Sequence, residues 1–356
     1  SVPGRVDDVV RRQWGQQLIG AWDDSDWWQA PQRVGDRVAR FLGAAPGHVV
    51  VADSTSVNLF KLLVAALRTA TLRTPGSRTE ILVDGHTFPT DAYVADSVAR
   101  LTGATVRRVD PDGVGDALAA RTAVVLLNHV DYRTGRLLDM AGLTTAVHGA
   151  GALALWDVSH SVGVLPLELD RLGVDLAVGA TYKFLNGGPG APSFVYVPHA
   201  AQRGFDQPLT GWGGHADPFA MRPEYVPSDG IARARSGTPD IVSLLTLDAA
   251  LDVWDGVDLG QVRAKGLRLT AFFMDCVDAL VPPGAATVVT PRGDDRGHQV
   301  SVEVADAELL VAALAEQGVV VDHRPPALLR FGFAPLYIGY RDALRAARVL
   351  AELLAA

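Results

Sequence analysis

Cysteine is almost absent from the sequence, since Cys276 is the single one in 356 residues. One cysteine excludes an internal disulfide and gives no support to a thiolate metal site, so we expect Cys276 to pack as a small hydrophobe. No apolar run approaches the length that spans a membrane, and the first residues, SVPGRVDDVVRRQWG, do not resemble a signal peptide. We therefore expect a cytoplasmic protein with no membrane partner.

Clusters of positive charge are absent as well. The formal net charge is −8 at pH 7, and no group of lysines and arginines is arranged to follow a phosphate backbone. We therefore expect no nucleic-acid partner. The chain also has no internal repeats, and no set of residues resembles a metal-ligand group, so we expect no bound metal.

Short apolar runs are what the sequence has instead, and helix-like stretches separate most of the early ones. The runs are rich in valine, isoleucine and leucine, at 49–53, 80–85, 122–128, 153–158, 176–182 and 194–197. Continuous apolar strands that alternate with helices are typical of a mostly parallel sheet covered on both faces. From about residue 260 the pattern becomes that of a compact α+β domain. We expect an N-terminal helical segment (1–45), a large domain (46–258) and a small C-terminal domain (259–356).

Polar residues follow the ends of these runs, and ligands of parallel sheets bind at the carboxyl ends of the strands. Thr55 and Ser56 begin a helix after the first run. A helix N-terminus attracts anions, although a simple helix cap is the alternative reading. The later strand ends carry the turn HTFPTD (86–91), Asn128, Asp157 with His160, and Lys183.

Lys183 stands between Tyr182 and a glycine-rich segment, and an ordinary solvated charge is its simplest interpretation. At the end of a buried strand, however, burial lowers the pKa of a lysine and makes its amine available for covalent chemistry. Pyridoxal phosphate needs a lysine for a Schiff base, a carboxylate beside the pyridine nitrogen and an anion site for the phosphate. Lys183, Asp157 and the helix start at Thr55 supply these groups, so we expect this cofactor.

The run WDVSHSVGVLPLELDRLGVDLAVGATYKFLNGGPGAPSFVYV (156–197) strongly resembles the kynureninases, which belong to the fold-type-I pyridoxal phosphate enzymes. Further stretches agree in the family's order: QWGQQLIGAWDDSDWW, DSTSVNLFKLL, HTFPTDAYVADS, HVDYRTGRLLDM, GWGGHADPFAM, SGTPDIVSL and RFGFAPLY. The resemblance spans nearly the whole chain. It implies an α/β fold of the fold-type-I transferase kind, with a mostly parallel seven-stranded sheet in the large domain and a smaller C-terminal α+β domain.

The resemblance also implies roles for individual residues. Lys183 bonds to the cofactor and moves the substrate's α-proton, Asp157 pairs with the pyridine nitrogen, and Tyr182 reaches the phosphate and donates a proton. Arg330 grips the substrate carboxylate as a bidentate fork. The other implied cofactor contacts are Thr55 and Ser56 at the phosphate, Phe88 on the ring with Pro89, Thr90 and Asp91 in its turn, Asn128 at O3′, His160 beside Asp157, and Trp212 and Thr238 from the neighbouring subunit of a homodimer.

The implied reaction is hydrolytic cleavage of a small molecule, L-kynurenine or its 3-hydroxy form, to L-alanine and an anthranilate. Trp22 or Trp28 would flank the substrate's ring. One alternative is a cysteine desulfurase or class V aminotransferase; a desulfurase needs a mobile nucleophilic cysteine, and Cys276 in the apolar stretch AFFMDCVDAL suits that role poorly. Another is a catalytically silent protein of the same fold, because a segment resembling YLDGNSLG, which lines the family's substrate site, does not occur in the printed sequence.

Overall fold

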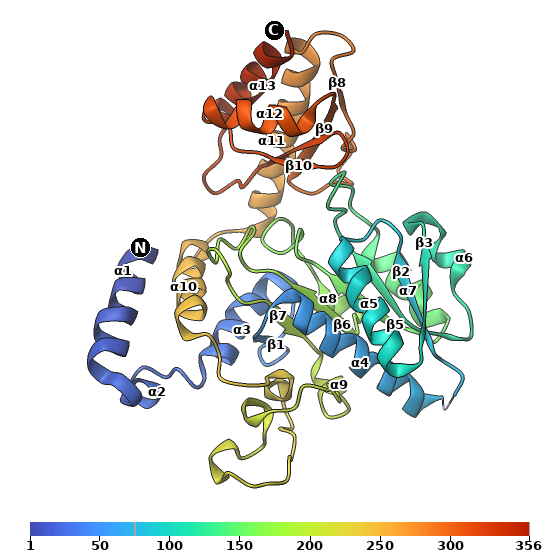
Figure 1. Ribbon diagram of the computed structural model, residues 1–356, viewed down its shortest axis with the longest axis vertical. Coiled ribbons are helices and arrows are strands. Elements are labelled where there is room, and N and C mark those ends of the chain that lie inside the picture. Colours follow the sequence, from blue (N-terminus) through green and yellow to red (C-terminus); the bar gives the residue numbers. More distant parts are fainter. Residues whose placement is uncertain (75, 356) are drawn as a thin grey trace. The chain divides into compact units, whose positions relative to one another are not determined.

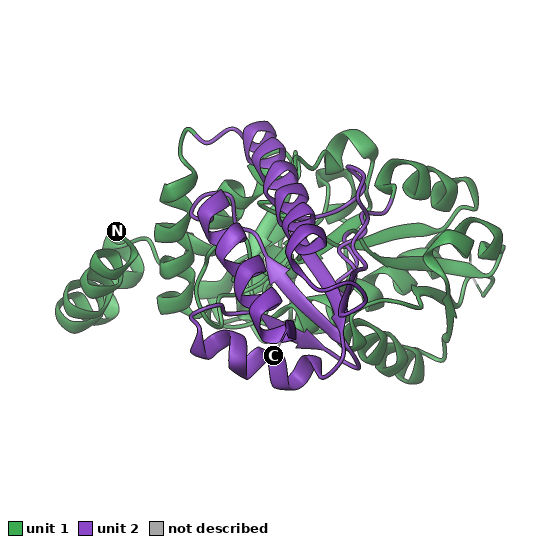
Figure 2. Cartoon of the chain, turned by 90° about the horizontal axis from the view of Figure 1, so that it is seen from above, with its two compact units in different colours: residues 1–129, 139–256 green, residues 130–138, 257–356 purple. Residues whose placement is uncertain are grey.

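The computed structural model describes residues 1–74 and 76–355 and divides the chain into two compact units. The first unit comprises residues 1–129 and 139–256, and the second comprises residues 130–138 and 257–356 (Figure 2). The boundary after residue 256 lies close to the end of the large domain expected from the sequence. The N-terminal residues belong to the first unit, and the apolar pattern gave no reason to join residues 130–138 to the second.

A seven-stranded sheet with the order β1-β7-β6-β5-β4-β2-β3 forms the centre of the first unit. The strands from β6 to β3 pair in parallel, whereas β7 pairs antiparallel with both β1 and β6. The expected fold, a mostly parallel seven-stranded sheet in a large α/β domain, is therefore confirmed. The strands are β1 (Val49–Val51), β2 (Glu80–Asp84), β3 (Thr105–Val109), β4 (Thr122–Asn128), β5 (Leu153–Asp157), β6 (Leu176–Gly179) and β7 (Phe194–Tyr196).

β3 is the strand of this sheet that the apolar pattern did not predict. Its sequence, TVRRV, places two arginines in the middle of the strand, and its residues are half-buried or exposed. Arg107 donates to the carboxylate of Glu80 at 3.0 and 3.1 Å, and Arg108 donates to Asp96 at 2.6 Å. A strand at the edge of a sheet tolerates such charges because one of its sides faces solvent. Because β3 lies at the edge, it does not need a continuous apolar sequence, which is the pattern from which the other strands were predicted.

Helices cover the sheet on both faces (Figure 1). The helices from α4 to α8 connect successive strands, as continuous apolar strands require when both faces are buried. Among the described residues, no helix combines the length and the apolar character needed to cross a membrane. The helices of this unit are α1 (Val2–Asp8), the π-helical η1 (Val9–Gln17), α2 (Ala21–Asp24), α3 (Ala30–Leu42), α4 (Thr55–Arg73), α5 (Pro89–Thr102), α6 (Val114–Ala117), α7 (Met140–Gly149), α8 (Leu169–Leu172), α9 (His199–Gln202) and α10 (Ile241–Leu251).

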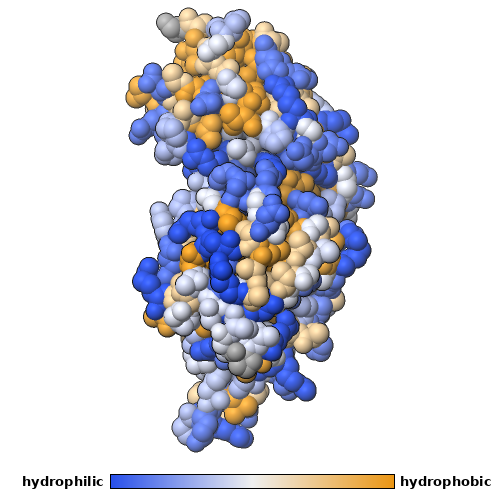
Figure 3. Space-filling view, turned by 90° about the vertical axis from the view of Figure 1, so that its right-hand side faces the viewer, coloured by the Kyte–Doolittle hydropathy of each residue, from blue (hydrophilic) through white to orange (hydrophobic). Residues whose placement is uncertain are grey.

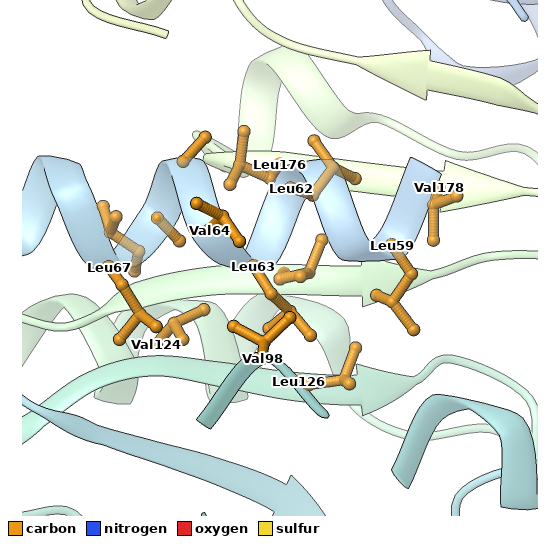
Figure 4. Close-up of a cluster of buried hydrophobic side chains, with 14 of the residues drawn as sticks. Leu59, Leu62, Leu63, Val64, Leu67, Val98, Val124, Leu126, Leu176 and Val178 are labelled. Carbon is orange, nitrogen blue, oxygen red and sulfur yellow. The ribbon is translucent and has the colours of Figure 1, made fainter. Parts of the chain in front are cut away.

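The main core of the first unit lies between α4 and the sheet. Figure 4 shows side chains of α4 packed over those of β4 and β6, with Val98 of α5 beside them. The labelled residues, all buried, are Leu59, Leu62, Leu63, Val64, Leu67, Val98, Val124, Leu126, Leu176 and Val178. Because the first turn of α4 faces the strand ends, this packing also fixes the position of Thr55 and Ser56.

Replacing Leu63 with alanine is expected to lower the free energy of unfolding by about 2–5 kcal/mol, because the side chain is fully buried and its loss leaves a cavity. Chemical denaturation with urea measures the change. Leu72→Ala is the matched control, since Leu72 lies on the same helix but is 78% exposed. A similar loss in the two variants would contradict this description of the core.

The second unit combines a four-stranded antiparallel sheet, in the order β10-β11-β9-β8, with three helices. This arrangement is the smaller α+β domain that the sequence predicted. Figure 3 shows apolar residues gathered over part of this unit, beside hydrophilic ones. Its elements are α11 (Leu259–Leu280), β8 (Ala286–Val288), β9 (Gln299–Val304), α12 (Ala307–Glu316), β10 (Asp322–Arg324), β11 (Leu328–Gly332) and α13 (Tyr340–Ala355).

Residues 130–138, which follow β4, are held within the second unit by hydrogen bonds. The amide of Leu137 donates to the carbonyl of Asp295 at 2.9 Å. The side chain of Gln299 donates to the carbonyls of Asp131 and Tyr132 at 2.9 and 3.1 Å. The chain that leaves the end of β4 is therefore anchored a few residues later in a different compact unit.

Candidate active site

A cavity of about 240 Å³ lies at the carboxyl ends of β4 and β5, beside the start of α4. Its lining includes ten residues that the sequence analysis proposed: Thr55, Ser56, Phe88, Thr90, Asp91, Asn128, Asp157, His160, Tyr182 and Lys183. The structure therefore brings together residues from five separate stretches of the chain. Because parallel strands present their carboxyl ends at one edge, this convergence follows from the sheet topology.

Four of the residues assigned to the cofactor or to the substrate carboxylate lie outside this cavity, as do Trp22 and Trp28. Pro89 begins α5 but does not line the cavity. Thr238 lines a neighbouring cavity, and Trp212 lines a third one. Arg330 belongs to β11 of the second unit, where it donates to Asp322 at 2.9 and 2.5 Å and to the carbonyl of Tyr132 at 2.8 Å.

The start of α4 is fixed by a cap and by a buried ion pair. The hydroxyl of Ser54 accepts a hydrogen bond from the amide of Val57 at 3.4 Å. Asp53, whose φ is +47°, accepts from the fully buried Lys61 at 2.5 Å. Lys61 also donates to the carbonyl of Ala234 at 2.8 Å. These bonds hold the sharp turn that presents the first amides and hydroxyls of α4 to the cavity.

Asn128 stands at the end of β4 in a closed hydrogen-bond network. Its carbonyl oxygen accepts from the hydroxyl of Thr87 at 3.1 Å and from the amide of Phe88 at 2.9 Å. Its amide nitrogen donates to Asp91 at 2.8 Å, and the same Asp91 oxygen, at 3.2 Å from the hydroxyl of Thr87, shares that group's single hydrogen with Asn128. The network fixes the turn before α5. The sequence analysis did not propose Thr87 as a site residue. Its position between His86 and Phe88, in a turn already assigned to the site, could have indicated it.

Asp157 ends β5 directly opposite Asn128 in the parallel register and is 8% exposed. The amide of Ser159 donates to its Oδ1 at 2.7 Å. The hydroxyl of Ser159 accepts in turn from the amide of Ala180 at 3.0 Å, so this serine links the end of β5 to the segment that carries Lys183. The sequence analysis did not propose Ser159, which lines the cavity as well.

Lys183 lies in a turn beyond the end of β6 rather than in the strand itself. The strand ends at Gly179, three residues before the end of the apolar run that was expected to precede Lys183, and the lysine is half-buried. Its Nζ lies 5.6 Å from the ring centre of Tyr182, which is 51% exposed. The following loop needs left-handed backbone at Gly188 (φ +90°) and Gly190 (φ +72°), which explains the glycines in the motif.

Lysine is rare in this chain, which has three. Lys61 is fully buried in its ion pair with Asp53, and Lys265 of α11 donates to the carbonyl of Pro335 in the second unit. Lys183 is the one of the three that lines the cavity. Lys183 is therefore the lysine of this chain that can offer its amine to a ligand in the cavity.

Asp91 has the most perturbed carboxyl in the cavity. Burial, and then the negative charge of Asp157, raise the pKa of Asp91 to about 8, while hydrogen bonds from Asn128 and Thr87 and the charge of Lys183 oppose the shift. Two neighbouring buried carboxylates cannot both ionise without cost. A positive group bound between them would remove this conflict.

Asp91→Asn is expected to change how stability depends on pH. Between about pH 4 and about pH 8 the folded protein holds a proton on Asp91 that the unfolded chain releases, so stability falls as pH rises through this window. Asparagine has no such proton. Urea unfolding of the cofactor-free proteins should show the variant gaining stability relative to the original chain as pH rises from about 4 to about 8. A stability difference that does not vary with pH would contradict the raised pKa.

The cavity's residues fit pyridoxal phosphate by their chemistry. Lys183 offers an amine for an aldehyde, Asp157 a buried carboxylate for a protonated ring nitrogen, and Phe88 an aromatic face. The hydroxyls and amides at the start of α4 suit a phosphate. In the part of the chain that the structure describes, no group of three or more histidine, cysteine, aspartate or glutamate side chains is placed to hold a metal ion.

Comparison with solved structures identifies the fold. The chain matches a cysteine desulfurase of Thermococcus onnurineus NA1 with a TM-score of 0.82 and 18% identity, over 99% of this chain and 91% of that one. It matches a cysteine desulfurase of Escherichia coli with a TM-score of 0.81 and 19% identity, over 99% and 91%. It also matches the lyase C-DES, solved with glycine covalently linked to its PLP cofactor, with a TM-score of 0.82, 16% identity and coverage of 99% and 92%.

Comparison of sequences gives much closer relatives. The chain is 43% identical to a kynureninase of Pseudomonas fluorescens over 354 residues, 98% of this chain and 85% of that protein. It is 44% identical to a kynureninase of Burkholderia pseudomallei over the same shares. The family described as the kynureninase C-terminal domain matches residues 262–350.

These matches define the class and the family of the protein. Its fold is that of the fold-type-I pyridoxal phosphate enzymes, and pyridoxal phosphate is its cofactor. Within that class, the chain belongs to the kynureninase family.

Proposed function

We propose that this chain hydrolyses the Cβ–Cγ bond of L-kynurenine or 3-hydroxykynurenine, yielding L-alanine and an anthranilate. The observation that carries the proposal is the placement of Lys183, Tyr182 and Asp157 in one cavity of a chain that is 43% identical to a kynureninase. When bound, the cofactor supplies an electron-accepting ring to which the substrate's amino group is attached. The other tasks fall to side chains of this chain.

The proposed task of each residue follows from its place in the cavity. Lys183 takes the proton from the substrate's α-carbon and returns it, and Tyr182 gives a proton to Cβ as a general acid. Asp157, which is buried and fixed by Ser159, keeps a negative charge beside the ring nitrogen. Thr55 and Ser56 hold the phosphate at the start of α4.

Further contacts of the cofactor and substrate are part of the same proposal. Phe88 stacks on the ring, with Pro89, Thr90 and Asp91 in its turn, and His160 supports Asp157. Asn128 donates one amide hydrogen to Asp91, so its second amide hydrogen would be the one directed at the ring oxygen. Arg330 binds the substrate carboxylate, with three of the guanidinium's five N–H groups already fixing its orientation on Asp322 and Tyr132.

A homodimer in the cytoplasm completes the proposal. Trp212 and Thr238 lie outside the cavity of their own chain, which supports their assignment to the phosphate site of a neighbouring subunit. Light scattering of the purified protein would measure the mass of the assembly, and a monomer would contradict this part of the proposal.

A desulfurase activity is the main alternative, because the solved structures of similar fold include cysteine desulfurases. Identities of 18% and 19% show the fold alone. Cys276 lies on α11 in the second unit, and burial and then the charge of Asp275 raise the pKa of its thiol. A nucleophilic cysteine needs the opposite shift. The structure therefore offers no activated thiol among the residues it describes.

A substrate panel tests the proposed function. Kynurenine, 3-hydroxykynurenine and L-cysteine are incubated separately with the cofactor-loaded protein, and anthranilate fluorescence and sulfide release are measured. We expect anthranilate or its hydroxy derivative and no sulfide. Rapid sulfide release would favour the desulfurase alternative, and a colourless protein that takes up no pyridoxal phosphate would favour a silent member of the fold.

A further inference from the structure

A second cavity, of about 330 Å³, adjoins the candidate active site and shares Ser54, Gly190 and Ala191 with it. We refer to it as the Arg235 cavity, because Arg235 lines it just before the segment Ser236–Thr238. Apolar residues such as Val51 and Leu244 form other parts of the wall. The size lies within the range that small-molecule sites use, and a few polar groups in an apolar wall are typical of such sites.

Arg235 is a buried cation without a counter-ion among the residues that the structure describes. Arg235 is one of the residues that line the cavity, it is only 3% exposed, and its buried Nη2 has no hydrogen-bond partner within residues 1–74 and 76–355. Burial lowers the pKa of Arg235 to about 10, and no carboxylate opposes that shift. Leaving a charge buried and unpaired is costly, so an acceptor is expected to complete the site.

The acidic residues that line the Arg235 cavity are engaged elsewhere. Asp53 pairs with Lys61 at 2.5 Å. Asp240 caps α10 and accepts from the amide and the hydroxyl of Ser243 at 3.2 and 2.7 Å. The cavity thus holds a guanidinium whose charge its own walls do not neutralise.

The ring of Trp28 orients the guanidinium. The central carbon of the Arg235 guanidinium lies 4.4 Å from the ring centre of Trp28, and Trp28 itself contacts the rings of Trp212 (4.8 Å) and Phe219 (5.1 Å). Stacking engages the flat face of a guanidinium and leaves its N–H groups in the plane for an anion. An in-plane carboxylate matches this geometry as a bidentate partner.

We propose that the Arg235 cavity binds the carboxylate of the aromatic acid that the reaction releases, and so retains the product beside the active site. This inference rests on the proposed function. The aromatic end of kynurenine is a neutral ketone, and cleavage turns that carbon into a carboxylate. Arg235 therefore distinguishes product from substrate by a charge that exists only after the bond has broken.

Binding of anthranilate and of aniline, its analogue without the carboxylate, tests the proposal by calorimetry on the cofactor-loaded protein. Arg235→Met, which keeps the bulk but removes the charge, is expected to raise the Kd for anthranilate about 10- to 100-fold, as loss of charge-assisted hydrogen bonds does. Aniline binding should change less than about 2-fold. Arg68→Met, at an arginine that pairs with Asp206 on the surface, is the matched control and should leave both affinities unchanged.

Three results would overturn the inference: no anthranilate binding to the original chain, equal anthranilate affinity in Arg235→Met, or equal losses for anthranilate and aniline. The thermal midpoint of the cofactor-free variant gives a second readout. Removal of an unpaired buried charge should leave this midpoint unchanged or raise it, and a clear fall would assign Arg235 a purely structural role. Kynurenine cleavage is measured separately, so failure of the anion site and failure of the proposed function are distinguishable.

Discussion

Lys183→Ala is expected to reduce kcat/KM for kynurenine cleavage by about 10⁴-fold or more, at the upper end of what loss of a positioned proton-transfer group costs. The reason is that no second lysine can take over. Lys61 is held in an ion pair with Asp53, and Lys265 donates a hydrogen bond to the carbonyl of Pro335. The fluorescence of released anthranilate measures the loss.

Two variants control this prediction. Lys183→Arg keeps the positive charge but lacks a group that can form the covalent bond, so it should be as inactive as the alanine variant. Lys265→Ala removes a lysine that bonds to a backbone carbonyl in the second unit, and its activity should stay within about 2-fold. If the Lys183 and Lys265 variants lost activity equally, the assignment of the catalytic amine would be wrong.

Asp157→Asn is expected to lower kcat/KM by roughly 10²- to 10⁴-fold, because removing one member of a buried charge pair costs about 3–5 kcal/mol. Asparagine has nearly the same shape, and its carbonyl oxygen can still accept from the amide of Ser159. The substitution thus removes the charge and preserves the geometry. Asp157→Glu, which keeps the charge but displaces it, should show a smaller loss.

The same substitution has a second, independent consequence at Asp91. Because the charge of Asp157 is one cause of the raised pKa of Asp91, this pKa of about 8 should fall in Asp157→Asn. Carbon-13 NMR of labelled aspartate in the cofactor-free protein follows the titration. An unchanged pKa of Asp91 would show that the two carboxyls do not interact and would weaken the description of the cavity.

The sequence predicted the sheet and most of the cavity because both depend on local patterns. Six of the seven strands end inside a continuous apolar run, and the carboxyl ends of the parallel strands share one edge. β6 shows the limit of this reasoning, since the apolar run continues to Tyr182 but pairing stops at Gly179. The run therefore placed the end of the strand three residues too late, although Lys183 does follow the strand as expected.

Features that depend on contacts between residues far apart in the sequence could not be predicted from local patterns. β3 carries arginines because it is an edge strand, and its position at the edge is a property of the sheet. Residues 130–138 join the second unit through bonds to Asp295 and Gln299, far along the chain. Arg235 lacks any local sign of burial, and its unpaired charge becomes visible only when Trp28 and the cavity wall are in place.

Chemical trapping tests the central claim, that Lys183 is the residue joined to the cofactor. The pyridoxal phosphate-loaded protein is reduced with borohydride, which fixes a carbon–nitrogen double bond as a stable amine, and its peptides are analysed by mass spectrometry. The account predicts one modified peptide, the one that contains Lys183. Modification at Lys61 or Lys265 instead, or a protein that retains no cofactor after reduction, would contradict it.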